Sequence, residues 1–144
     1  MTTTKDGPYL IAALICEKIL QEKDETVSII RMVDRVTLTT QAALSPETLP
    51  PMALSLNAFI SFKSGSARGR HTVKLSIETP SGLKLPEQLL PVLFEGEDRG
   101  VNLILGINIV VDQEGVYWFD VLLENVLLTR IPLRILYQRI GQSI

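Results

Sequence analysis

The chain has 144 residues, of which 46% are hydrophobic and 21% are charged, and this composition excludes a disordered protein. The length fits a single domain over residues 1–144 that can bury a core without disulfides. The formal net charge of −2 argues against nucleic acid and anionic membranes, because binding to either needs clustered Lys and Arg. We therefore expect neither partner.

The first apolar run, Tyr9–Leu20, contains the one cysteine, Cys16, so no intramolecular disulfide can form. The run is too short to cross a bilayer and lacks the basic flank of a signal peptide. These features indicate a cytoplasmic protein. The spacing of its apolar residues suits a strand or a short helix. We favour a strand, because Lys23–Glu25 makes a plausible turn into the next β-rich run.

The second run, Thr26–Leu38, predicts one strand with a bulge or a change of face at Ile29 and Ile30, where the alternation of apolar and polar residues breaks. The segment Thr39–Met52 is rich in proline and is predicted to be a loop. Further strands are expected at Ala53–Lys63, Arg70–Thr79, Val92–Glu95, Val101–Val111, Val116–Glu124 and Leu127–Gln138. Turns are expected at Gly65–Ala67, Pro80–Gly82, Glu95–Gly100 and Asp112–Gly115.

These runs predict an all-β fold, an antiparallel two-sheet β-sandwich of immunoglobulin-like or jelly-roll-like type with about eight strands. Alternation also assigns the faces of the strands, because successive side chains point to opposite sides of a sheet. The predicted core contains Leu75, Ile77, Phe119, Val121 and Leu133.

Five segments carry a family resemblance: Ala12–Glu17, Arg31–Arg35, His71–Leu75, Gly115–Asn125 and Ile131–Arg134. In their order and spacing the chain resembles a family of uncharacterised bacterial β-sandwich proteins, a domain of unknown function. The resemblance implies an all-β fold and a cytosolic bacterial protein. It implies no activity, and it offers no functional residue to carry over.

Catalytic chemistry finds little support in the residues. The sequence has no G-x-S-x-G motif, and its one histidine, His71, follows Arg68 and Arg70 at an expected solvated strand end. One histidine and one cysteine match no zinc spacing. We therefore expect no catalytic residue, no cofactor and no metal.

Three other charged segments have ordinary structural interpretations. Asp34 and Arg35 lie on opposite faces of the expected strand, so at least one of them is expected to form an ion pair with a cross-strand partner rather than to bind a ligand. The acidic segment Glu95–Arg99 lacks calcium-loop spacing, and Arg99 would oppose a cation, so a solvated turn is expected. The segment Gly65–Arg70 could hold phosphate but lacks the P-loop lysine and helix, so a hairpin loop is expected.

Two functional hypotheses follow from outward-facing aromatic and aliphatic residues. The first is a non-enzymatic module that binds itself, as a homodimer, or another protein. The second is a sandwich that binds a carbohydrate or small ligand, on which Trp118 or Tyr137 stacks. A groove with polar groups around the aromatic side chain would favour the ligand, and a flat apolar patch would favour the protein partner.

The first hypothesis names an interface patch. If the turn Asp112–Gly115 pairs the strands on either side of it, their outward apolar residues form one surface. Either a second subunit or the segment Leu83–Pro91 could cover that surface, and we favour the subunit because two-fold pairing is the commonest oligomer. The predicted interface residues are Trp118, Leu122, Phe59, Ile104 and Val110.

Overall fold

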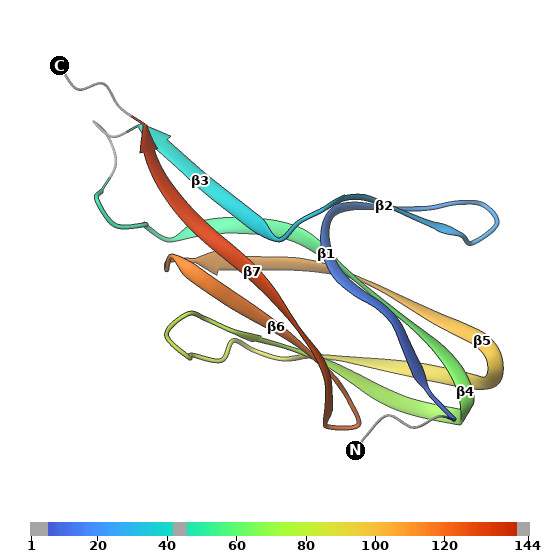
Figure 1. Cartoon of the computed structure of the whole chain (residues 1–144). Helices are drawn as coiled ribbons and strands as arrows, with labels where there is room; N and C mark the ends of the chain where they lie inside the picture. The colour runs from blue at the N-terminus through green and yellow to red at the C-terminus, as the bar shows by residue number, and fades with distance from the viewer. Residues whose placement is uncertain (1–5, 42–45, 141–144) are drawn as a thin grey trace.

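The computed structural model describes residues 6–41 and 46–140. All elements of regular secondary structure in these ranges are β-strands (Figure 1). The strands are β1 (Tyr9–Gln21), β2 (Val27–Met32), β3 (Arg35–Gln41), β4 (Met52–Glu78), β5 (Gln88–Val111), β6 (Gly115–Leu123) and β7 (Val126–Ile140). In the described ranges no helix is long and apolar enough to cross a membrane. The all-β prediction is confirmed, as is the strand at the first apolar run.

Hydrogen bonds join the strands into one curled sheet with the order β2-β1-β4-β6-β7-β3, and β5 pairs with β4 outside this path. Most neighbours are antiparallel, but β3 and β7 run parallel. The expectation of purely antiparallel pairing is therefore wrong at this pair. The chain reaches β3 from β2, at the other end of the sheet, so the direction of β3 is set by that crossing and not by a hairpin.

The longest strands, β4 and β5, form one hairpin that bends in the middle (Figure 1). The register shifts between Lys63 and Arg68, where turns were predicted at Gly65–Ala67 and Glu95–Gly100. Gly65 and Gly96 have positive φ there, a conformation that glycine adopts at no steric cost. These segments are bulges rather than turns, because a bulge interrupts alternation as a turn does while the strand continues. The first half of β4 pairs with β1, and the second half pairs with β6.

The buried face follows the predicted alternation. Leu75, Ile77, Phe119, Val121 and Leu133 are all buried, as predicted. The core continues along the first half of β4 through Leu54, Leu56, Ala58, Ile60 and Phe62.

The two ends of the sheet, β2 and β3, are consecutive in the chain. Val33 N donates to Ile15 O of β1 at 2.8 Å, and Arg134 N of β7 donates to Asp34 O at 3.1 Å. The link Val33–Asp34 therefore crosses from one end of the sheet to the other. The sheet is closed here by the covalent chain and not by a strand pair.

The predicted single strand Thr26–Leu38 is thus two strands on different neighbours. The bulge expected at Ile29 and Ile30 is absent, since both residues pair in regular register with β1. The interruption falls at Val33–Asp34 instead. The predicted loop Thr39–Met52 also differs in extent, because β3 continues to Gln41 and β4 begins at Met52. Residues 42–45 of that loop lie outside the described ranges.

Candidate functional site

A groove of about 610 Å³ lies where the curled sheet fails to close by hydrogen bonds. Its long walls are Arg35–Thr37 of β3 and Leu54–Leu56 of β4, and the link between β2 and β3 closes one end. Glu17 and Arg31 complete the lining. This volume is within the range of about 300–1,000 Å³ that is usual for ligand sites.

The β4 wall presents unpaired main-chain groups. Ile15 O accepts a hydrogen bond from Val33 N, so the main chain of Ile15 faces away from β4. The next residue, Cys16, then faces β4, where it pairs with Asn57. Because the main-chain direction alternates along a strand, Ser55 faces the same side as Asn57. The pairing of β1 with β4 ends at Asn57, so Ser55 N–H and C=O face the groove with no strand partner in the described ranges.

The β3 wall has the same property. Asp34 O accepts from Arg134 N, so Asp34, and with it Val36, faces β7. Thr37, the next residue, must direct its N–H and C=O to the opposite side. Within residues 6–41 and 46–140, β3 pairs with no strand other than β7. The main chain of Thr37 therefore also faces the groove.

Side-chain alternation gives the groove two sides. Leu54 and Leu56 belong to the core, and Val36 packs against it. Arg35, Thr37 and Ser55 are exposed on the solvent side. A groove with free main-chain donors and acceptors on both walls and apolar side chains beneath is suited to one added β-strand.

The charges at the groove differ from the prediction. Arg31 Nε and Glu17 Oε2 form an ion pair at 2.9 Å. Neither Asp34 nor Arg35 has an ion pair in the described part of the chain, so the expected pairing of these residues is wrong. The reason is positional: Asp34 lies in the crossing link, and the cross-strand neighbour of Arg35 is another arginine, Arg134.

The sequence singled out Asp34 and Arg35 but missed the groove. The nearest signal was the break in alternation at Ile29 and Ile30, which we interpreted as a bulge or a change of face within one strand. No local pattern distinguishes a bulge from a crossing between the two ends of a sheet, because both interrupt a period of two.

The predicted interface patch is divided between two regions. The strands β5 and β6 do not pair, since β6 lies between β4 and β7. The hairpin expected at Asp112–Gly115 is therefore wrong. That link carries the chain from the first half of β4, beside which β5 ends, to the second half, beside which β6 runs. A short polar link serves a hairpin or such a crossing equally well.

Three of the five predicted patch residues lie along the first half of β4. Ile104 pairs with Phe59 and Val110 pairs with Ala53, both on the first half of β4. Ile104 and Val110 are 41% and 61% exposed, whereas Phe59 is buried at 9%, although alternation placed it outward.

The other two patch residues face a different surface. Trp118 and Leu122 pair with Glu78 and Lys74 on the second half of β4 and are half-buried. The guanidinium of Arg130 lies 4.6 Å from the centre of the Trp118 ring. In the segment Leu83–Pro91, which we considered as a cover, Leu83 and Leu89 are exposed, whereas Leu85 and Leu90 pack against the core.

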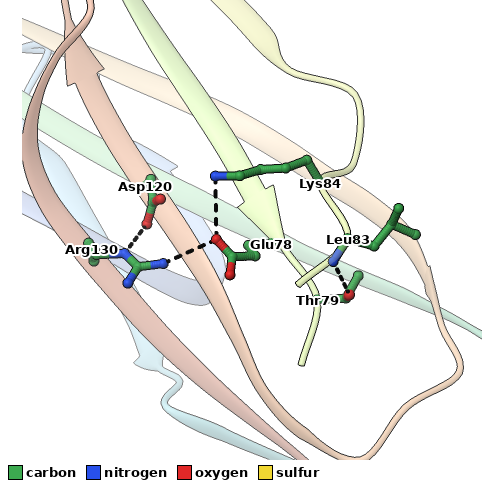
Figure 2. A network of polar contacts seen from close by, with 6 residues as sticks. All are labelled: Glu78, Thr79, Leu83, Lys84, Asp120 and Arg130. Carbon is green, nitrogen blue, oxygen red and sulfur yellow. Dashed lines mark hydrogen bonds and ion pairs between the residues drawn. The ribbon is translucent and has the colours of Figure 1, made fainter. Parts of the chain in front are cut away.

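A polar network surrounds this surface (Figure 2). Arg130 Nε donates to Asp120 Oδ1 at 2.7 Å, and its Nη2 lies 3.5 Å from Glu78 Oε1. Lys84 Nζ lies 3.3 Å from the same Glu78 oxygen. The hydrogen bond to Asp120 raises the pKa of Arg130. The surface is therefore an ordered ionic network rather than an apolar patch.

His71 is half-buried rather than solvated. It lies on the core side of β4, with its ring 5.1 Å from the ring of Phe94 and its Nδ1 3.2 Å from Gly69 O. The expectation of a solvated strand end is wrong because the strand continues through the bulge. The contacts are those of a packed side chain, not of a base oriented by a carboxylate.

The segments Gly65–Arg70 and Glu95–Arg99 lie opposite each other in the bent hairpin and largely neutralise each other. Arg68 Nη2 lies 3.4 Å from Glu97 Oε1, and Arg99 Nη1 lies 3.2 Å from Glu95 Oε1. Arg68 Nη1 also donates to Glu95 O at 2.8 Å. In the described part of the chain no group of three or more His, Cys, Asp or Glu residues is placed to hold a metal ion.

The fold and the groove define an all-β protein in which two free strand edges face one cavity. Residues 11–136 match the model of a family of unknown function, DUF6941, so the chain belongs to that family. The resemblance to a family of unknown function drawn from the sequence is thereby confirmed.

Among solved structures, the chain is similar to an immunoglobulin-like protein from Pseudomonas aeruginosa. The two are 10% identical, the match covers 92% of this chain and 99% of that one, and the TM-score is 0.43. We draw nothing about function from a similarity at that level. No curated protein matches the chain.

Proposed function

We propose that the protein is a non-enzymatic interaction module that binds an extended segment of another polypeptide in the groove between β3 and β4. The observation that carries this proposal is that the main-chain groups of Thr37 and Ser55 face one groove and have no strand partner among the described residues. A strand added there would bond to both walls, and its alternate side chains would pack against Val36, Leu54 and Leu56.

The energetics suit a reversible partner. Each main-chain hydrogen bond contributes about 0.5–1.5 kcal/mol net, and apolar burial adds about 25 cal/mol per Å². Ordering the peptide opposes both contributions, so a short segment is expected to bind in the micromolar range or more weakly.

Self-association remains a second candidate. A homodimer through Ile104 and Val110 is supported by their exposure of 41% and 61% on the same face of β5, where Gly106 and Asn108 lie between them. Trp118 and Leu122 support it less, because Arg130 lies over the tryptophan ring.

The carbohydrate alternative has weaker support. The cation over Trp118 occupies one ring face, and Tyr137 Oη donates to Pro46 O at 2.7 Å. The ring of Tyr137 also packs against the core, so both aromatic side chains already have partners within the chain, which makes a sugar-stacking role less well supported.

The proposal also covers the source of the protein, its cellular compartment and the partners that it does not bind. We infer a bacterial, cytoplasmic protein with no nucleic-acid, membrane or cofactor partner, supported by the net charge of −2 and the buried, unreactive Cys16, whose thiol pKa is raised by burial. The framework that we propose for the groove is a two-layered, immunoglobulin-like sandwich, supported by the bend in the β4–β5 hairpin.

Ser55→Pro tests the groove. Proline removes the N–H that faces the groove and places its ring there, while the bonds from β4 to β5 use other residues. The probe is the peptide Thr-Val-Gln-Val-Gln-Val-Thr, titrated into isotope-labelled protein and followed by amide chemical shifts. In the wild type the Thr37 and Ser55 amides should shift, and in the variant affinity should fall by about tenfold or more.

The matched control is Ser55→Ala, which keeps the N–H and loses only the side-chain bond to Asn108. It should bind the peptide within about threefold of the wild type. Binding by Ser55→Pro at wild-type strength, or peptide-induced shifts confined to residues outside the groove, would overturn the proposed function.

A further inference from the structure

Arg35 lines the groove and has a second arginine beside it, Arg134 of β7, on the side of β3 away from the groove. Arg35 of β3 and Arg134 of β7 are direct partners in the parallel register, and both side chains are exposed on the solvent face. Like charges placed directly opposite each other destabilise a sheet. In the described ranges neither guanidinium has an ion pair, so nothing in that part of the chain offsets the repulsion.

Most of the carboxylates discussed so far form ion pairs with arginines other than Arg35 and Arg134. Glu17 pairs with Arg31 at 2.9 Å. Asp120 and Glu78 bind Arg130. Asp34 also lines the groove and has no ion pair, but it is a single charge beside two arginines. The outer rim at Arg35 therefore keeps an excess of positive charge.

We propose that the segment bound in the groove carries an aspartate or glutamate beside Arg35, and that Arg35 and Arg134 share its carboxylate. This inference rests on the proposed function and names the chemistry of its partner. Arginine is suited to the role, because its planar fork of donors matches a carboxylate.

Alternation then specifies the segment further. If the acidic residue faces the solvent side with Arg35, the residues before and after it face Val36, Leu54 and Leu56. The partner is therefore an extended segment of another protein in which an acidic residue lies between two apolar ones.

Two peptides that differ only in charge test the inference: Thr-Val-Glu-Val-Glu-Val-Thr and its glutamine analogue Thr-Val-Gln-Val-Gln-Val-Thr. The wild type should bind the glutamate peptide about 3–10-fold more tightly at low salt, and the preference should shrink as salt screens the exposed charges. Arg35→Gln and Arg134→Gln should each bring the affinities for the glutamate and glutamine peptides closer together.

Arg70→Gln is the matched control, since it removes the same charge from an exposed arginine away from the groove. It should keep the full preference for glutamate. Equal binding of the two peptides by the wild type, or an unchanged preference in both rim variants, would overturn the charge inference and leave the groove in place. Failure of both peptides to bind would overturn the proposed function and this inference with it.

Discussion

The outer edge of the first part of β5 and the edges of β3 and β4 at the groove differ in one respect. A proline faces outward on the β5 edge, whereas the groove edges have none at the corresponding positions. In the second half of the bent hairpin, the first residues of β5 pair with β4 on one side and have no strand on the other within the described ranges. The main-chain N–H of Thr72 donates to Glu124 Oε1, and its C=O accepts from the N–H of Glu124. The main chain of Thr72 therefore faces away from β5. Its partner Pro91 must then face away from β4, toward the free edge.

Proline at position 91 removes one donor from this edge and places a ring where another strand would add. The groove edges carry Thr37 and Ser55 at the equivalent positions, and neither is blocked. One edge is closed to other chains and the other is open, which is the arrangement expected if strand addition is restricted to the groove.

The largest effect is expected from breaking the core that supports both edges. Phe119 of β6 is fully buried in the core, and Phe119→Ala should lower the free energy of unfolding by about 3–5 kcal/mol. Urea unfolding measures this loss. Leu93→Ala, at a site that is 52% exposed, should change stability by less than about 1 kcal/mol. Equal losses in the two variants would show that the faces of these strands are misassigned.

Replacing Pro91 tests whether this residue keeps other strands from adding to the outer edge of β5. Pro91→Thr supplies the missing N–H, and the variant should form concentration-dependent oligomers in light scattering while its stability changes by about 1 kcal/mol or less. Pro86→Thr makes the same substitution in the segment before β5 and should remain like the wild type. A Pro91→Thr variant whose apparent mass equals that of the wild type at every concentration would show that Pro91 does not protect the edge.

The smallest effect on stability is expected at Tyr117, which lies beside the link Asp112–Gly115 between β5 and β6. Within residues 6–41 and 46–140 the buried Tyr117 Oη makes no hydrogen bond of good geometry, although the main chain of Asp112 and Gln113 lies close enough to interact with it weakly. A buried hydroxyl without a partner is unfavourable, so Tyr117→Phe should raise the free energy of unfolding by up to about 1 kcal/mol.

The pH dependence of this variant is a second readout. Burial raises the pKa of Tyr117 above its ordinary value of 10.0, so its folded state keeps the proton longer than its unfolded state. The corresponding stability is present below that pH and is lost as the pH rises through the folded pKa. Above about pH 10 the wild type should therefore lose stability more steeply than Tyr117→Phe. Parallel curves for the two proteins would contradict the burial of this hydroxyl.

The sequence by itself determined that the chain is all β and which side chains of its clearest strands enter the core. Val73, Leu75 and Ile77 alternate with polar residues, and that alternation depends on local geometry alone, since each side chain points opposite to its neighbours. The same locality explains why the buried residues of β6 were predicted correctly although the strand beside it was not.

Only the tertiary structure decided the pairing, and with it the groove. Glycine at position 65 suits a turn or a bulge, and Asp112–Gly115 suits a hairpin or a crossing, because each choice depends on strands far away in the sequence. The free groups of Thr37 and Ser55 are of the same kind: a main-chain edge is open or closed according to which strand lies beside it. The Val33–Asp34 crossing places β3 opposite β4 without pairing them, and no local pattern of apolar and polar residues encodes that distance.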